Sequence, residues 1–204
     1  MQAPLEAQKL RVGVLISGRG SNLKALIEAA SADIYPAELV CVLSNRADAA
    51  GLDPAREANI PALAIPHKDF DDRAAFERAL TRALTEHAVD LVCLAGFMRL
   101  LSGEFVRHWQ GRLVNIHPSL LPAYKGLDVH RRMIEDAAKI AGCTVHYVTE
   151  DMDAGPIIDQ RAVPILADDT PDSLAARILT EEHRLYPDCV RMIAEGKAPF
   201  VRGS

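Results

Sequence analysis

The sequence lacks the features that mark membrane, secreted and nucleic-acid-binding proteins. No apolar run reaches the roughly 18 residues that a membrane span needs, and residues 1–9 contain no apolar core of a signal peptide. The formal net charge is −5 and there is no basic block, so a nucleic-acid partner has no electrostatic counterpart here. We therefore expect a cytoplasmic protein with no membrane or nucleic-acid partner.

Motifs for metal binding and covalent catalysis are also missing. The four cysteines are scattered without any C-x-x-C spacing, which is typical of a protein in a reducing compartment. The zinc motif H-E-x-x-H is absent, and so is the G-x-S-x-G of a serine nucleophile. We predict that the protein uses neither a metal nor a covalent enzyme intermediate.

What is present is a regular alternation of apolar runs and amphipathic stretches. Nearly continuous apolar runs favour parallel strands that are covered on both faces, and helices between them favour βαβ units. The expected strands are residues 10–16, 37–43, 61–66, 89–97 and 113–116, and the expected helices are residues 21–30, 48–58 and 72–86. We predict one α/β domain over residues 1–204, with helices on both faces of a mostly parallel, twisted sheet.

The pattern changes in the last third of the chain. Residues 143–148 and 156–165 are two strand-like runs, and the connection between them is too short for a helix. This pair is therefore expected to be antiparallel, which gives the sheet one late antiparallel strand. Thr170 and Pro171 then open a helix as N-cap and first helical residue.

A glycine-containing loop follows the first expected strand. Gly18 and Gly20 allow a tight turn, and the helix that begins at Ser21 offers free N–H groups to an anion. Leu23 stands where a dinucleotide loop has its third glycine, and no Walker A lysine is present. The loop therefore favours a monophosphate over NAD or ATP, and a plain turn capped by Ser21 is an equally good interpretation from this motif alone.

Asn115 and His117 are the most suggestive polar pair in the chain. They lie two residues apart near the end of an expected strand, so they point to the same face, at the sheet edge where ligands of parallel sheets bind. An imidazole suits acid–base chemistry and a carboxamide suits an oxyanion. Asp153, in the late connection, is the carboxylate expected to orient His117. The alternative for Asn115 and His117 is a structural role at the end of the strand. The alternative for Asp153 is an ordinary Asp-rich turn.

Glu182 falls on the apolar side of the last expected helix, in line with Leu174 and Ile178. A buried carboxylate needs partners, so Glu182 is expected to hold an amine or hydroxyl of a ligand. A helix-edge acid that reaches solvent is the alternative.

Taken together, these motifs resemble the glycinamide ribonucleotide formyltransferases of purine biosynthesis. The resemblance runs from about residue 11 to residue 193, in the order of that family. The stretches that carry it are ISGRGSN, LAGFMRLL, LVNIHPSLLP, VHYVTEDMDAGP and Glu182-His183. The string N-x-H-P-S-L-L-P is very specific for folate-dependent formyl transfer, and the start S-G-x-G-S-N indicates this branch.

The resemblance implies an activity, two substrates and a set of site residues. The implied reaction is formyl transfer from 10-formyltetrahydrofolate to glycinamide ribonucleotide by a monomer or homodimer. The implied catalytic residues are Asn115, His117 and Asp153. The implied nucleotide residues are Gly20, Ser21, Asn22 and Glu182. The implied folate residues are Arg73, Met98, Arg99, Leu100, Leu101, Asn115, Thr149, Glu150, Asp151, Met152 and Asp153.

The same resemblance divides the domain into a nucleotide-phosphate half, about residues 10–100, and a folate and catalytic half, about residues 101–195, behind a flexible tail over residues 1–9. Three positions depart from the family pattern. Lys125 stands where proline is frequent, Asp128 where histidine is frequent, and Ala154 where glycine is common. The resemblance therefore gives no detailed role for residues 124–130.

Other classes share part of these features. Methionyl-tRNA formyltransferase carries an extra RNA-binding domain, for which this chain has neither the length nor the charge. Formyltetrahydrofolate hydrolase usually has an N-terminal regulatory domain, and about ten residues precede the first expected strand here. A non-catalytic nucleotide-binding module would keep the glycine loop but would not need Asn115, His117 and Asp153.

Overall fold

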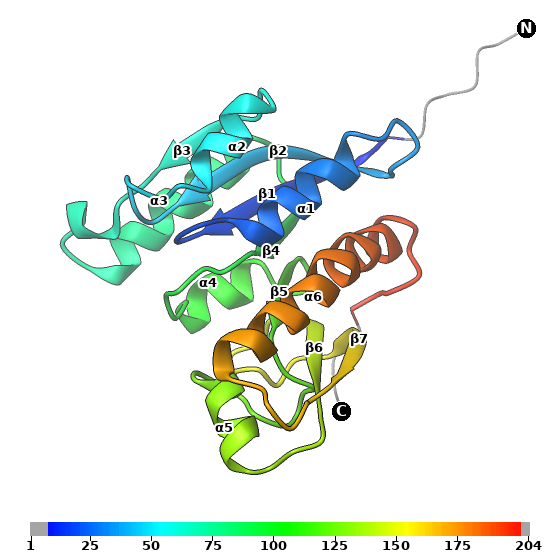
Figure 1. The fold of residues 1–204 in the computed structure, drawn as a ribbon. Coiled ribbons are helices and arrows are strands. Elements are labelled where there is room, and N and C mark those ends of the chain that lie inside the picture. Colours follow the sequence, from blue (N-terminus) through cyan, green and yellow to red (C-terminus); the bar gives the residue numbers. More distant parts are fainter. Residues whose placement is uncertain (1–7, 201–204) are drawn as a thin grey trace, which may run out of the picture.

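A single sheet of seven strands runs through the computed structural model, which describes residues 8–200 (Figure 1). The strands are β1 (Leu10–Ile16), β2 (Ala37–Ser44), β3 (Ala62–Ala64), β4 (Leu91–Leu94), β5 (Leu113–His117), β6 (Ile140–Tyr147) and β7 (Ile157–Pro164). Their order across the sheet is β3-β2-β1-β4-β5-β6-β7. Of the tail predicted to be flexible, only Gln8 and Lys9 belong to the described residues.

The strand directions confirm the predicted sheet. β1 to β5 pair in parallel, and β6 pairs antiparallel with both β5 and β7. Only β6 therefore runs against the other strands among the described residues. The pairing of β6 with β5, which places Asn115 opposite His146, was not predicted, because no local signal in the sequence sets the partner of a strand.

The helices partly match the expected ranges. They are α1 (Ser21–Ala30), α2 (Leu52–Glu57), the 3-10 helix η1 (His67–Asp69), α3 (Arg73–Glu86), α4 (Gly103–His108), α5 (Val129–Glu135) and α6 (Pro171–Ala194). The expected helix over residues 48–58 is wrong in its first turn, because residues 47–51 form turns before α2 begins. α4 and α5 were not predicted; each has fewer than eight residues, too few for a clear apolar periodicity.

Two apolar layers cover the two faces of the sheet. In β1, Val12, Val14 and Ile16 point to the layer that contains α1 and α6, whereas Leu15 points to the layer of α3 and α4. Figure 1 shows α1 and α6 side by side over the first of these faces. No helix formed by residues 8–200 is long and apolar enough to cross a membrane.

The alternation along β5 positions the polar pair. Val114 and Ile116 belong to the core under α6, and Leu113 belongs to the core under α3 and α4. Asn115 and His117 therefore share the face of Leu113, but they lie beyond it along the strand. The sheet thus presents both side chains on the face opposite α1 and α6.

Candidate active site

The three residues predicted to be catalytic meet in the structure. His117 lies at the end of β5, and its Nδ1 is 3.5 Å from Oδ2 of Asp153, in the connection between β6 and β7. The side chains are 7% and 12% exposed, respectively. Asn115 is two residues before His117 on the same face. An amide, an imidazole and a carboxylate therefore converge from segments that are far apart in the sequence.

Main-chain groups fix both ends of the His117–Asp153 pair. Nε2 of His117 donates to the carbonyl of Tyr124 at 2.9 Å, and Oδ2 of Asp153 accepts from the amide of Gly126 at 2.9 Å. An imidazolium here would donate from Nε2 to the carbonyl and form an ion pair with the carboxylate through Nδ1. Tyr124 and Asp153 have φ values of 53° and 49°, a strained conformation that is frequent at functional sites.

The turn after β5 is held by buried hydrogen bonds. Oγ1 of Thr144 donates to the carbonyl of Ser119 at 2.6 Å and accepts from the amide of Leu121 at 3.0 Å. The Leu121–Pro122 peptide bond is cis. Oγ of Ser119 donates to the carbonyl of Ala123 at 2.6 Å. These contacts set the path of the chain towards the Tyr124 carbonyl that receives His117.

His146 is a fourth member of the cluster that sequence reasoning missed. Its Nε2 lies 3.4 Å from Nδ2 of Asn115 and 3.7 Å from Oδ1 of Asp153, and its Nδ1 donates to the carbonyl of Tyr147 at 2.9 Å. Burial lowers the pKa of His146, although the Tyr147 carbonyl and the charge of Asp153 oppose this shift. A neutral ring with its lone pair on Nε2 accepts from the amide of Asn115 and so orients it.

The predicted phosphate loop has the geometry of an anion site. Gly20 is left-handed, with φ 69°, and α1 starts after it without a side-chain cap, so its first N–H groups stay available to a ligand. A Cβ on Gly20 would lie 2.8 Å from Cα of Gly51, and one on Gly51 would lie 2.7 Å from Cδ1 of Ile16. Gly51 was not predicted; only the fold brings it against the loop.

Asn22 and Glu182 meet beside this loop. Nδ2 of Asn22 donates to Oε2 of Glu182 at 2.7 Å, and the two residues are both 7% exposed. Burial raises the pKa of Glu182, and the hydrogen bond from Asn22 opposes that shift. Oδ1 of Asn22 is buried and has no hydrogen-bond partner. The pair thus offers acceptor oxygens to a ligand with N–H or O–H donors.

The segments predicted to bind folate carry exposed apolar side chains. Met98, Leu100 and Met152 are 74%, 71% and 57% exposed. The guanidinium of Arg99 lies 5.9 Å from the centre of the Phe76 ring on α3. This contact places the segment of residues 98–101 against the first turns of α3, the helix that begins at Arg73.

The remaining predicted folate residues are less closely tied to the cluster. Glu150 forms a 2.8 Å ion pair with Arg107 of α4, so its carboxylate points to that helix. Oγ1 of Thr149 donates to the carbonyl of Asp151 at 3.3 Å, which shapes the connection that ends at Asp153. Among residues 8–200, no hydrogen bond or ion pair joins Arg73 to another predicted site residue.

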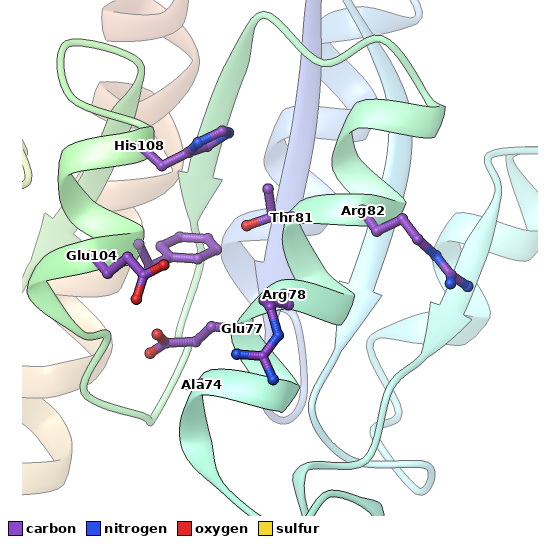
Figure 2. A pocket seen from close by; sticks show the side chains of 8 residues that line it. Ala74, Glu77, Arg78, Thr81, Arg82, Glu104 and His108 are labelled. Carbon is purple, nitrogen blue, oxygen red and sulfur yellow. The ribbon is translucent and has the colours of Figure 1, made fainter.

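A separate hollow of about 290 Å³ lies between α3 and α4 (Figure 2). In Figure 2, Glu77 and Arg78 come from α3, and Glu104 and His108 come from α4. None of the predicted catalytic residues lines this hollow. Within residues 8–200, no group of three or more His, Cys, Asp or Glu is arranged to hold a metal ion.

Comparison with known proteins adds independent information. The formyl transferase family model matches residues 10–190. The phosphoribosylglycinamide formyltransferase of Escherichia coli (strain K12) is 45% identical over 188 residues, which cover 92% of this chain and 89% of that protein. The trifunctional purine biosynthetic protein adenosine-3 of Bos taurus is 48% identical over 192 residues, or 94% of this chain, but the chain spans only 19% of that protein's length.

Solved structures share the whole fold. Glycinamide ribonucleotide transformylase 1 from Symbiobacterium toebii has a TM-score of 0.92 and 47% identity, covering 96% of this chain and 92% of that chain. Phosphoribosylglycinamide formyltransferase from Brucella melitensis has a TM-score of 0.88 and 49% identity, covering 96% of this chain and 100% of that chain. The chain belongs to the formyl transferase family, among the phosphoribosylglycinamide formyltransferases.

Proposed function

We propose that the chain transfers the formyl group of 10-formyltetrahydrofolate to the amine of glycinamide ribonucleotide, giving formylglycinamide ribonucleotide and tetrahydrofolate in de novo purine biosynthesis. The observation that carries this proposal is the meeting of Asn115, His117 and Asp153. The names of the relatives that match almost full length support the same reaction.

The nucleotide binds at the start of α1. Its phosphate is held by the main-chain N–H groups of Gly20, Ser21 and Asn22 and by the hydroxyl of Ser21, where the positive end of the helix dipole favours a dianion. Glu182 and the unpartnered Oδ1 of Asn22 accept hydrogen bonds from its hydroxyl and amide groups. This arrangement directs the amine of the nucleotide towards β5.

The folate binds between two exposed segments. Met98, Leu100, Leu101 and Met152 supply apolar surface for the ring system, and this use accounts for the exposure of three of them. The main chain of Thr149, Glu150 and Asp151 lines the other side. Arg73 and Arg99, near the start of α3, bind the acidic end of the folate.

The chemistry is direct acyl transfer. The amine attacks the formyl carbon, and an oxyanion forms. One of the two side-chain amide hydrogens of Asn115 is bound by His146, and Asn115 donates the other to the oxyanion. Protonated His117 adds positive charge beside the oxyanion, with its ring held by the carbonyl of Tyr124. Asp153 balances that charge. The bond from the carbon to the folate nitrogen then breaks, and the proton lost by the amine goes to the folate through water.

The proposal includes the setting of the enzyme. We propose that it works in the cytoplasm, as a monomer or homodimer, without a metal ion. Its partners are the two substrates, with no nucleic acid and no membrane.

An assay for tetrahydrofolate tests the proposed function, with glycinamide ribonucleotide and 10-formyltetrahydrofolate supplied together. Product should appear only when both are present. Asn115→Ala should lower kcat about a hundred- to thousand-fold, the usual cost of losing one oxyanion donor. An active wild type with an equally active Asn115→Ala would refute the role of Asn115, and no product from the wild type would refute the function.

A further inference from the structure

The hydroxyl of Ser17 joins two loops that the proposed function assigns to different substrates. Ser17 follows β1 and is 5% exposed. Its Oγ donates to Oδ1 of Asn45 at 2.6 Å and accepts from the amide of Met98 at 2.8 Å. Its own amide donates to the carbonyl of Gly96 at 3.1 Å. One side chain of the phosphate loop therefore fixes the start of the folate segment, residues 98–101.

Asn45 anchors this link in a third loop. It follows β2 and is 4% exposed. Its main-chain carbonyl oxygen lies 3.0 Å from Nδ1 of His67 in η1. The amide of His67 also donates to that carbonyl, at 3.3 Å. Asn45 is thus buried and hydrogen-bonded itself, and it fixes the direction in which the Ser17 hydroxyl points. This rigidity makes the position of the Met98 amide depend on Ser17.

The far end of the folate segment has an anchor of its own. The amide of Ser102 donates to Oε1 of Glu77 at 2.8 Å, and Glu77 is 5% exposed on α3. Between the two anchors, Met98 and Leu100 are exposed, whereas Leu101 packs against the core of α3 and α4 and Arg99 lies over the Phe76 ring. At its start, the segment is held by the Ser17 hydrogen bond and by the packing of the preceding Phe97.

We propose that Ser17 is a positioning residue that sets the folate segment relative to the nucleotide loop. This inference rests on the proposed function, which assigns the two loops to the two substrates. Without the hydroxyl, the amide of Met98 and Oδ1 of Asn45 both lose a buried partner, and the segment loses one of its two hydrogen-bonded anchors. Ser17 hydrogen-bonds to none of Asn115, His117 and Asp153, so the chemical step keeps its groups.

Two variants separate this role from a general effect on stability. Ser17→Ala removes the link. Ser44→Ala is the matched control, because Ser44 is also buried at the end of a strand, yet its hydroxyl bonds only to the main chain of Arg46, at 2.9 and 3.1 Å. Ser17→Cys, which nearly keeps the volume but weakens both hydrogen bonds, replaces Ser17→Ala if that variant does not fold.

Amide hydrogen exchange of the ligand-free protein gives the first readout. Exchange over residues 97–101 should become at least about tenfold faster in Ser17→Ala and stay unchanged in Ser44→Ala, because loss of one buried hydrogen bond shifts a local equilibrium by about that factor. The second readout is steady-state kinetics. In Ser17→Ala, KM for 10-formyltetrahydrofolate should rise about tenfold, and kcat should fall less than threefold.

The outcomes are distinct. Unchanged exchange over residues 97–101 in Ser17→Ala, or the same change in Ser44→Ala, overturns the inference. A fall in kcat without a rise in the folate KM also overturns it. If the wild type transfers no formyl group, the proposed function fails, and the exchange comparison still decides separately whether Ser17 holds the segment.

Discussion

At the scale of single residues, Asp153 links two histidines and a main-chain amide of the site. Its two carboxylate oxygens face His117, His146 and the amide of Gly126. A largely buried carboxylate is costly unless it is paired, and the left-handed backbone at Asp153 adds strain. Such an arrangement is best explained by a role in the reaction, because an apolar residue would fill the space at lower cost.

Asp153→Asn is expected to lower kcat about a hundredfold or more. The amide can still accept from Gly126, so the connection keeps its path, but the negative charge beside His117 is lost. KM for glycinamide ribonucleotide should change less than twofold, because Asn22 and Glu182 are untouched. Steady-state kinetics with each substrate varied in turn measures both constants; a kcat near that of wild type would remove Asp153 from the mechanism.

Gly51→Ala should damage the phosphate loop although Gly51 lies outside it. A methyl group there would lie 3.0 Å from Cα of Gly20 and from the carbonyl oxygen of Gly18, and 2.7 Å from Cδ1 of Ile16, so the Ile16 side chain and the loop must both give way slightly. KM for the nucleotide should rise about tenfold, and the free energy of unfolding should fall by roughly 1–3 kcal/mol, as in other overpacked sites. In Gly18→Ala the methyl meets nothing within 4 Å, so equal losses in both variants would contradict the explanation.

The sequence predicted residues whose chemistry is visible locally and missed those that matter through spatial contact. Asn115 and His117 could be paired because two residues on a strand share a face. His146 could not, because its place opposite Asn115 depends on the register between β5 and β6. Gly51 was missed for a similar reason: its approach to Gly20 follows from how the loops after β1 and β2 pack.

At the scale of elements, the start of α6 combines several stabilising contacts. Thr170 caps the helix in a capping box with Ser173. Asp169 accepts from both terminal nitrogens of Arg177, at 2.6 and 2.9 Å, and from the amide of Leu166 at 2.8 Å. The hydrogen bond from Arg177 is the first reason why the pKa of Asp169 lies well below its usual value, followed by the bonds from Leu166 and Ser173.

Asp169→Asn should melt at a lower temperature than wild type at pH 7. The folded state lowers the pKa of Asp169. The stability that the charged carboxylate contributes is therefore present in full above the usual Asp pKa of about 4, and it is lost as the pH falls from there towards the pKa of the folded state. The gap between the two melting temperatures should therefore narrow below about pH 4. Melting curves from pH 7 to pH 2 measure it, with Asp168→Asn as an exposed control; a gap that stays constant with pH would contradict the assignment.

Long elements were easier to predict than short ones. α1 has the predicted bounds, and α6 begins at the predicted cap, because their apolar stripes extend over several turns. α4 lies between β4 and β5, and α5 follows the turn after β5, where Pro118 and Pro122 favour irregular structure. Short helices are stabilised by the core that they cover, and Phe105 of α4 and Met133 of α5 are both buried in that core. A local sequence pattern does not contain this information.

At the scale of the whole molecule, the fold joins the two ends of the described chain at one site. Asn22 and Glu182 are 160 residues apart in sequence and form a 2.7 Å hydrogen bond, because α1 and α6 pack side by side (Figure 1). The division into a nucleotide half and a folate half stays a prediction. The proposed nucleotide site already draws on both halves, since Glu182 lies in the second.

Glu182→Gln should weaken nucleotide binding and remove part of its pH dependence. Burial raises the pKa of Glu182, so in the wild type the carboxylate becomes protonated, and KM for the nucleotide rises, at a higher pH than an ordinary Glu would give. In the variant, KM should be about tenfold higher at pH 8 and nearly constant down to about pH 5. Glu181→Gln is the control, because Glu181 pairs with Arg184 at 2.7 Å; parallel pH profiles for wild type and Glu182→Gln would disprove the role.

The segment after the cis proline hydrogen-bonds to the reactive groups through its main chain. The carbonyl of Tyr124 receives His117, and the amide of Gly126 is bound by Asp153, while the side chain of Lys125 takes no part in either hydrogen bond. Side chains here are free to diverge as long as the backbone trace is kept, which fits the departures at Lys125 and Asp128. A mutant library at residue 125 would therefore keep both hydrogen bonds while it changes the charge near His146, whose pKa Lys125 helps to lower.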